Sequence, residues 1–158
     1  MSMFGPNLRA SVAQTVTAAA YSSGNAVGGL MTFANMANRD GYGGIIQTVI
    51  VRDKAGQNVN YDLILFDANP TNTTVTDKAA VAVNTADLSK IIGVVQLSGI
   101  VLGAASTMGV LTAAGVGLAY RISSTSNSNL YGILVTRGAP TYASTSDVTV
   151  DVVAMPDA

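Results

Sequence analysis

The chain has 158 residues and a formal net charge of −1, and only 11% of its residues are charged, under half of the roughly 25% typical of soluble domains. It contains no histidine, cysteine, glutamate or tryptophan, which excludes Ser-His-Asp and Cys-His nucleophile systems and zinc sites made of Cys and His. Its Lys and Arg residues form no basic run that would attract nucleic acid. These exclusions favour a structural or assembly protein over an enzyme.

Residues 1–11 are predicted to form an extended N-terminal arm, because Gly5-Pro6-Asn7 blocks regular structure. The segment lacks the apolar centre of a secretory signal peptide. An irregular segment with apolar side chains is typical of one that docks on a surface, either on its own domain or on a neighbour. The candidate contacts of this arm with a partner surface are Met3, Phe4, Leu8 and Arg9.

Residues 12–158 are predicted to form one β-sandwich domain. The clearest pair of strands, 45–52 and 59–66, is predicted to be a hairpin with Gly56 in a left-handed turn position. Gly28-Gly29 suggests a bulge or a close approach of the backbone. The predicted strands, assigned from alternating apolar residues, span 12–21, 26–36, 45–52, 59–66, 93–98, 100–103, 116–122, 130–137 and 147–154.

One short helix is predicted near residues 85–92, where Asn84 can cap it, Asp87 favours its positive end and Gly93 stops it. The charge-free run from 91 to 120 is interrupted by polar residues and glycines, so a membrane span is not expected. About eight short strands with polar turns, separated in places by long excursions, predict an all-β, jelly-roll β-sandwich.

Aspartates are the only carboxylates left for acid–base chemistry. Asp147 and Asp151 share a strand face but lie roughly 13 Å apart, too far to share a proton. We therefore expect no catalytic residues, no cofactor and no metal site; the one metal left open is a calcium ion on Asp40, Asp53 or Asp77. The six tyrosines are interpreted as core or interface residues rather than a sugar-binding platform.

One block of strand, turn and helix cap is distinctive: Leu63-Ile64-Leu65-Phe66-Asp67-Ala68-Asn69-Pro70-Thr71, then Thr76-Asp77-Lys78-Ala79-Ala80, then Asp87-Leu88-Ser89-Lys90-Ile91-Ile92-Gly93-Val94-Val95. Over roughly residues 20–155 the chain resembles the small jelly-roll decoration, or cement, proteins on the heads of tailed bacteriophages. The resemblance implies a multimer on the outer surface of the virion, where it bridges major capsid subunits and stabilises the shell. It implies no catalytic residues.

Low charge and the uncharged run from Ile91 to Tyr120 imply buried surface between copies. We expect a homo-oligomer, a trimer in preference to a dimer, whose other partner is the major capsid protein and which binds neither nucleic acid nor membrane. Two other classes stay open. A carbohydrate-binding or adhesin module of jelly-roll type would need exposed tyrosines gathered on one concave face, and a hydrolase would need measurable turnover.

Overall fold

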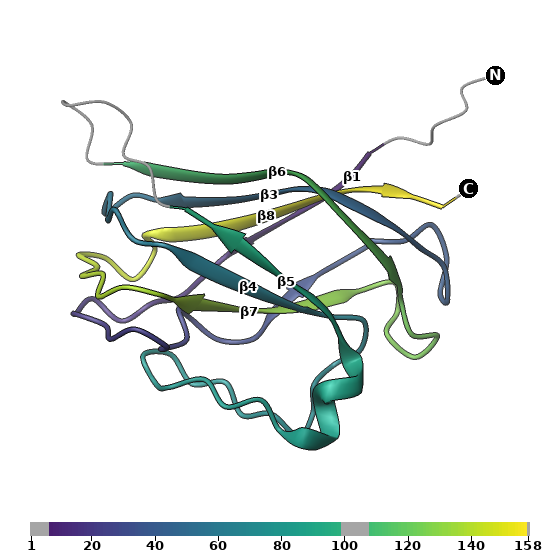
Figure 1. Ribbon diagram of the computed structural model, residues 1–158, viewed down its shortest axis with the longest axis horizontal. Coiled ribbons are helices and arrows are strands. Elements are labelled where there is room, and N and C mark those ends of the chain that lie inside the picture. The colour runs from purple at the N-terminus through teal and green to yellow at the C-terminus, as the bar shows by residue number, and fades with distance from the viewer. Residues whose placement is uncertain (1–6, 99–107, 158) are drawn as a thin grey trace.

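The computed structural model describes residues 7–98 and 108–157, which form two four-stranded antiparallel sheets packed as two layers (Figure 1). The strands are β1 (Leu8–Ala13), β2 (Met31–Phe33), β3 (Gly43–Asp53), β4 (Tyr61–Phe66), β5 (Ile91–Leu97), β6 (Gly109–Arg121), β7 (Leu130–Thr136) and β8 (Val148–Pro156). One sheet has the order β1-β8-β3-β6 and the other β2-β7-β4-β5. A 3₁₀ helix, η1 (Thr85–Lys90), precedes β5.

Every connection between consecutive strands crosses from one sheet to the other, except the one between β4 and β5. Together with the two sheet orders, this is the topology of an eight-stranded jelly roll. The predicted all-β jelly-roll sandwich is therefore confirmed. The predicted short helix is present, capped by the Asn84 side chain on the N–H of Ala86, but it is a 3₁₀ helix that ends at Lys90, and β5 begins before Gly93.

The core between the sheets follows from the two-residue period of the strands. In β8, Val148, Val150 and Val152 have no exposed surface, and in β4 the same holds for Leu63 and Leu65. Side chains two apart on a strand share a face, so these residues point inward from the two layers. Burial of each contributes about 1.5–3 kcal/mol, and their sum holds the sheets together.

The predicted hairpin of residues 45–52 and 59–66 is wrong, because β3 and β4 lie in different sheets. β3 pairs with β6 and β8, whereas β4 pairs with β5 and β7. Gly56 does take the predicted left-handed conformation, with φ of 63°. The connection 54–60 is long enough to cross the roughly 10 Å between packed sheets. Because β3 and β4 lie in different sheets, each of them pairs with two other strands.

The first two predicted long strands are shorter than expected. Strand 12–21 ends at Ala13, and strand 26–36 shrinks to Met31–Phe33. The predicted close approach at Gly28 is confirmed, since its φ is 78° and a side chain there would lie 2.3 Å from Gln14 Oε1. The strand predicted over 100–103 lies outside the described residues.

Regular structure at the N-terminus begins at Leu8, so residues 8–11 of the predicted arm belong to β1. Leu8 pairs with Ala154 of β8 and Arg9 pairs with Val153. The edge of β8 offers backbone partners to any segment that can extend along it, whatever the side chains of that segment. Met3 and Phe4, the other two candidate contacts, lie outside the described residues.

Deleting residues 1–11 removes Arg9 and Ser11, which both donate hydrogen bonds to the buried carboxylate of Asp151. After the truncation only Arg52 still pairs with this carboxylate, and most of β1 is lost. We therefore expect the truncation to lower the free energy of unfolding by about 3 kcal/mol. Deleting residues 1–6 keeps all of β1 and is the control. Urea denaturation followed by circular dichroism measures both, and equal stability of the two truncations would contradict the role given to β1.

Candidate interaction surface

Most aspartates accept hydrogen bonds at separate places in the fold, and Asp53 and Asp147 line one pocket. Asp147 accepts the backbone N–H groups of Ala143 and Ser144, whereas the Asp151 side chain lies on the outer face of the β1-β8-β3-β6 sheet. Within residues 7–98 and 108–157, no three potential metal ligands come together. The aspartates considered for calcium each accept hydrogen bonds at a different place in the fold: Asp40, Asp53 and Asp77.

Most of the tyrosines are in the core, and the described residues contain no exposed tyrosine platform. Tyr21 and Tyr142 stack edge to face with ring centroids 5.1 Å apart, and the hydroxyls of Tyr142 and Tyr61 are 2.8 Å apart. These three and Tyr120 are buried, and burial raises the pKa of Tyr120 to about 12. Of the remaining two, Tyr42 is 39% exposed and lies beside Arg39.

The two outer faces of the sandwich differ in how far other parts of the chain cover them. The outer face of the β2-β7-β4-β5 sheet carries a second apolar cluster of Phe66, Ile133 and Val135. The long connection from β4 to η1 covers this cluster with Val75, Val81 and Val83 and lies below β4 and β7 in Figure 1. This connection is therefore a lid over one sheet.

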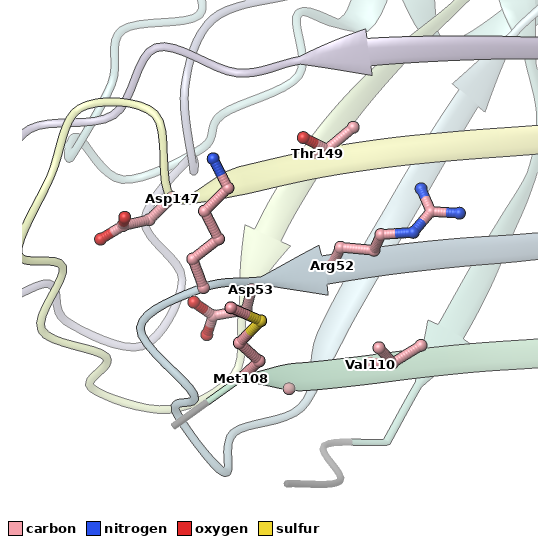
Figure 2. Close-up of a pocket in the computed structure, with 8 residues that line it drawn as sticks. Arg52, Asp53, Met108, Val110, Asp147 and Thr149 are labelled. Carbon is pink, nitrogen blue, oxygen red and sulfur yellow. The ribbon is translucent and has the colours of Figure 1, made fainter. Parts of the chain in front are cut away.

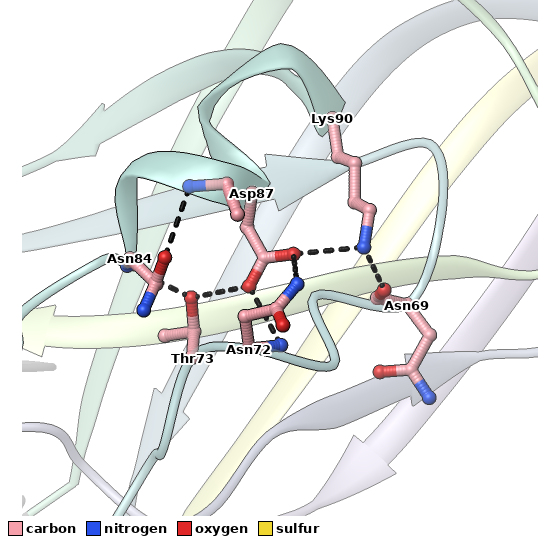
Figure 3. A network of polar contacts seen from close by, with 7 residues as sticks. Asn69, Asn72, Thr73, Asn84, Asp87 and Lys90 are labelled. Carbon is pink, nitrogen blue, oxygen red and sulfur yellow. Dashed lines mark hydrogen bonds and ion pairs between the residues drawn. The ribbon is translucent and has the colours of Figure 1, made fainter.

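The lid is held in place by the carboxylate of Asp87, which has no exposed surface (Figure 3). Asp87 accepts hydrogen bonds from the backbone N–H of Asn72 at 2.9 Å and the hydroxyl of Thr73 at 2.8 Å, and pairs with Lys90 Nζ at 2.8 Å. Burial alone would raise the pKa of Asp87, but these donors outweigh it and hold the pKa at about 2. The carboxylate thus fastens the start of the connection to η1.

Asp77 fastens the middle of the lid to the connection between β1 and β2. Its oxygens accept from the N–H and hydroxyl of Thr17 at 2.8 and 2.7 Å, the hydroxyl of Tyr21 at 2.6 Å and the N–H of Gly28 at 2.6 Å. Partial burial would raise the pKa of Asp77, but these hydrogen bonds bring it below its usual value. Gly28 is required at this point because a side chain there would collide with Gln14.

The outer face of the β1-β8-β3-β6 sheet has no comparable cover from the described residues. On one side of the register shift in β3, strand pairing sets twelve outward side chains in three rows, and most of them are small or β-branched and uncharged. Beyond the shift the face continues with Met155, Ile45 and Ala119. We call the set of twelve the bare face. Across the strands β1, β8, β3 and β6, its rows are Arg9, Val153, Thr48 and Ala114; Ser11, Asp151, Ile50 and Thr112; and Ala13, Thr149, Arg52 and Val110.

The charges of the bare face form one cluster, the Asp151 cluster, made of Arg9, Ser11, Arg52 and Asp151. Arg9 Nη2 and Arg52 Nη1 both donate to Asp151 Oδ2, the latter at 2.6 Å, and Ser11 Oγ donates to Oδ1 at 2.5 Å. The carboxylate is fully covered, while the side chains of Arg9 and Arg52 remain 54% and 40% exposed. Burial would raise the pKa of Asp151, but its three donors lower it. The cluster carries one net positive charge.

A pocket of about 210 Å³ lies at one end of the bare face, between the ends of β3, β6 and β8 (Figure 2). Arg52, Asp53, Met108 and Asp147 are among its lining residues. Figure 2 shows the Arg52 guanidinium running along the sheet, whereas the Asp147 carboxylate is buried against the N–H groups of Ala143 and Ser144. Asp53 is engaged by the N–H groups of the turn that follows it. The exposed wall of the pocket is therefore mainly apolar, and Lys54 completes its charged lining.

Of the four candidate contact residues, Arg9 lies on the bare face, and half-buried Leu8 packs at the edge of the sandwich. The sequence analysis missed Asp151, Arg52 and Ser11. The alternation of Asp151 with buried valines marked it as outward-facing, but only the pairing of β1 and β3 with β8 brings the two arginines to it.

Comparison of the chain with models of known protein families and with curated proteins gave no match. In the described ranges, no helix is long and apolar enough to cross a membrane.

Asp87→Asn should lower stability at pH 7, because an amide cannot accept from all the donors that surround Asp87. The folded-state pKa of about 2 lies below the ordinary 3.8, so the stability that this carboxylate contributes is present above pH 4 and is lost as the pH falls towards 2. The difference in melting temperature between wild type and variant should therefore shrink over that range.

Differential scanning calorimetry between pH 7 and pH 2 measures this difference, and Asp157→Asn, which removes an exposed carboxylate, is the control. Parallel melting curves for wild type and Asp87→Asn across the whole range would show that Asp87 does not hold the lid.

Proposed function

We propose that this chain is a structural virion protein that decorates the outer surface of a tailed-phage capsid and stabilises it by bridging major capsid subunits. The observation that carries the proposal is the bare face: a sheet surface of mostly small, uncharged side chains in a protein that covers its other sheet with a lid. Exposed, weakly charged sheet faces of this kind are typical of surfaces that bind another protein. The resemblance of the block from Leu63 to Val95 supplies the class of partner.

The fold gives less support to the two alternative functions, a carbohydrate-binding module and a hydrolase. A carbohydrate-binding module of jelly-roll type would use exposed aromatic side chains, and Tyr21, Tyr61, Tyr120 and Tyr142 are buried. A hydrolase would need paired acids or an activated nucleophile. Asp53 and Asp147 line one pocket, but each carboxylate accepts backbone N–H groups of its own turn. The decoration role needs neither of these.

We further propose that the chain acts as a homo-oligomer, a trimer in preference to a dimer. β5 and β6 end their sheets on the same side of the sandwich, where the Leu118 side chain lies over Gly93. Val94 in β5 is 51% exposed, and Leu88 in η1, just before β5, is 52% exposed. Residues 91–98 and 108–120 contain no charge, so this side can be buried between copies without desolvating an ion.

The purified protein at micromolar concentration should therefore have three times the mass of the 16.0 kDa chain. Multi-angle light scattering measures the mass. Val94→Lys places a charge on the side formed by β5 and β6, and we expect it to shift the mass toward that of the monomer. Thr74→Lys, at an exposed position on the lid, is the control and should keep the mass of the wild type. A monomeric wild type would contradict the oligomer.

Capsid shells of the phage that encodes the chain, prepared without this protein, should bind it at a fixed stoichiometry and become more resistant to heat. Ala114→Trp puts a bulky side chain on the bare face, and we expect it to reduce occupancy at least tenfold. Ala82→Trp is the matched control, because Ala82 is an exposed alanine in the connection that covers the other sheet.

Cryo-electron microscopy of the mixed shells gives both the occupancy and the orientation of the bound protein. Shells that stay undecorated with the wild type would overturn the proposed function. Equal occupancy with the two tryptophan variants would leave decoration standing but move it to another surface.

A further inference from the structure

We propose that the bare face docks on a protein surface that presents a carboxylate, and that the Asp151 cluster recognises this carboxylate through Arg9 and Arg52. The inference rests on the proposed function, and it adds the chemistry of the contact. It identifies the partner group as an aspartate or glutamate side chain at the centre of an otherwise uncharged contact.

The geometry of the cluster leaves donors for a second acceptor. Each guanidinium has five N–H donors in a fixed planar fork, and one nitrogen of Arg9 and one of Arg52 are used on Asp151 Oδ2. The covered carboxylate fixes both arginines on the face, while about half of each side chain stays exposed. Two guanidiniums held in this way are preorganised for a further carboxylate, which binds them without a new ordering cost.

The charge of the face selects the sign of the partner. Among the twelve side chains of the bare face only Arg9, Arg52 and Asp151 are charged, which leaves one net positive charge. A partner that covered this face with apolar groups alone would bury an excess guanidinium without compensation, at a cost of several kcal/mol. A partner carboxylate neutralises the excess and accepts the remaining N–H groups.

A two-fold contact with a second copy of the chain does not fit this face. In a two-fold interface the same patch meets itself, so the Asp151 clusters of two copies would oppose each other with positive charge on both sides. Nucleic acid does not fit either, because its affinity depends on many phosphate contacts and the face offers one net charge. Because the proposed contact between copies uses the side formed by β5 and β6, we assign the bare face to a different protein with a matching acidic group.

The first test uses an immobilised ten-residue polyaspartate peptide and biolayer interferometry at low salt, with the whole protein as analyte. Asp151→Asn removes the internal carboxylate and frees both arginines, so binding should tighten about fivefold. The triple variant Arg9→Gln/Arg52→Gln/Asp151→Asn neutralises the cluster without leaving a buried charge, and binding should weaken about fivefold. A gain with the first variant cannot come from unfolding.

The matched control is Arg137→Gln. Arg137 forms an ion pair with Asp62 at 2.6 Å on the other sheet, with its side chain 48% exposed. The substitution changes the net charge by −1, as the triple variant does by losing two positive charges and one negative. Arg137→Gln should bind polyaspartate like the wild type, and an equal loss in both variants would show a nonspecific charge effect and overturn the proposal.

The second test measures the same variants on the capsid shells. Wild type and Arg137→Gln should decorate the shells equally, and the triple variant should lose at least tenfold in affinity. If the triple variant decorates like the wild type, decoration stands and the acidic contact is overturned. If the wild type does not decorate at all, the proposed function fails, and the polyaspartate results alone decide whether the cluster recognises carboxylates. Cluster-dependent binding to duplex DNA as tight as to polyaspartate would overturn the choice of a protein partner.

Discussion

A two-layer sandwich covers only the inner face of each sheet, and the outer faces must be covered by something else or meet solvent. Antiparallel sheets usually solve this with polar residues on the outer side. This chain has few charges to place there. It covers one outer face with the connection between β4 and η1, and on the other it keeps mostly small uncharged side chains around a single ion cluster. The molecule therefore has one covered outer face and one bare outer face.

Three carboxylates in this chain fasten segments that are distant in the sequence. Asp77 and Asp87 each gather donors from segments distant in the sequence and hold the lid, and Asp151 joins three strands across their outer face. An aspartate is short, so its oxygens lie close to the backbone and reach N–H groups that a longer side chain would overshoot. Folding therefore depends on these acids being ionised, and acid weakens the lid and the bare face together.

The sequence predicted the fold class and most strands because alternation of apolar residues in segments such as β8 is a local property. It also predicted the cap at Asn84 and the left-handed Gly56, which depend only on neighbouring residues. It failed on the pairing of β3 with β4, because a hairpin and a crossing connection of similar length have the same local pattern. The Asp151 cluster was missed for the same reason. Its members come from three strands, and the sequence of one strand does not determine which residues of the other two lie beside it.

β6 ends its sheet with thirteen residues, and from Gly109 to Tyr120 none of them is charged. Natural edge strands are usually guarded by lysine, proline or a cover, because an unpaired ladder of N–H and C=O groups is a template for another strand. In β6 the single charged residue is Arg121, the last residue of the strand. Gly115 and Gly117 have positive φ in the middle of the strand. Protein stored in concentrated form without its partners is therefore exposed to edge-to-edge aggregation at β6, and this places an upper limit on useful concentration that thermal stability does not reveal.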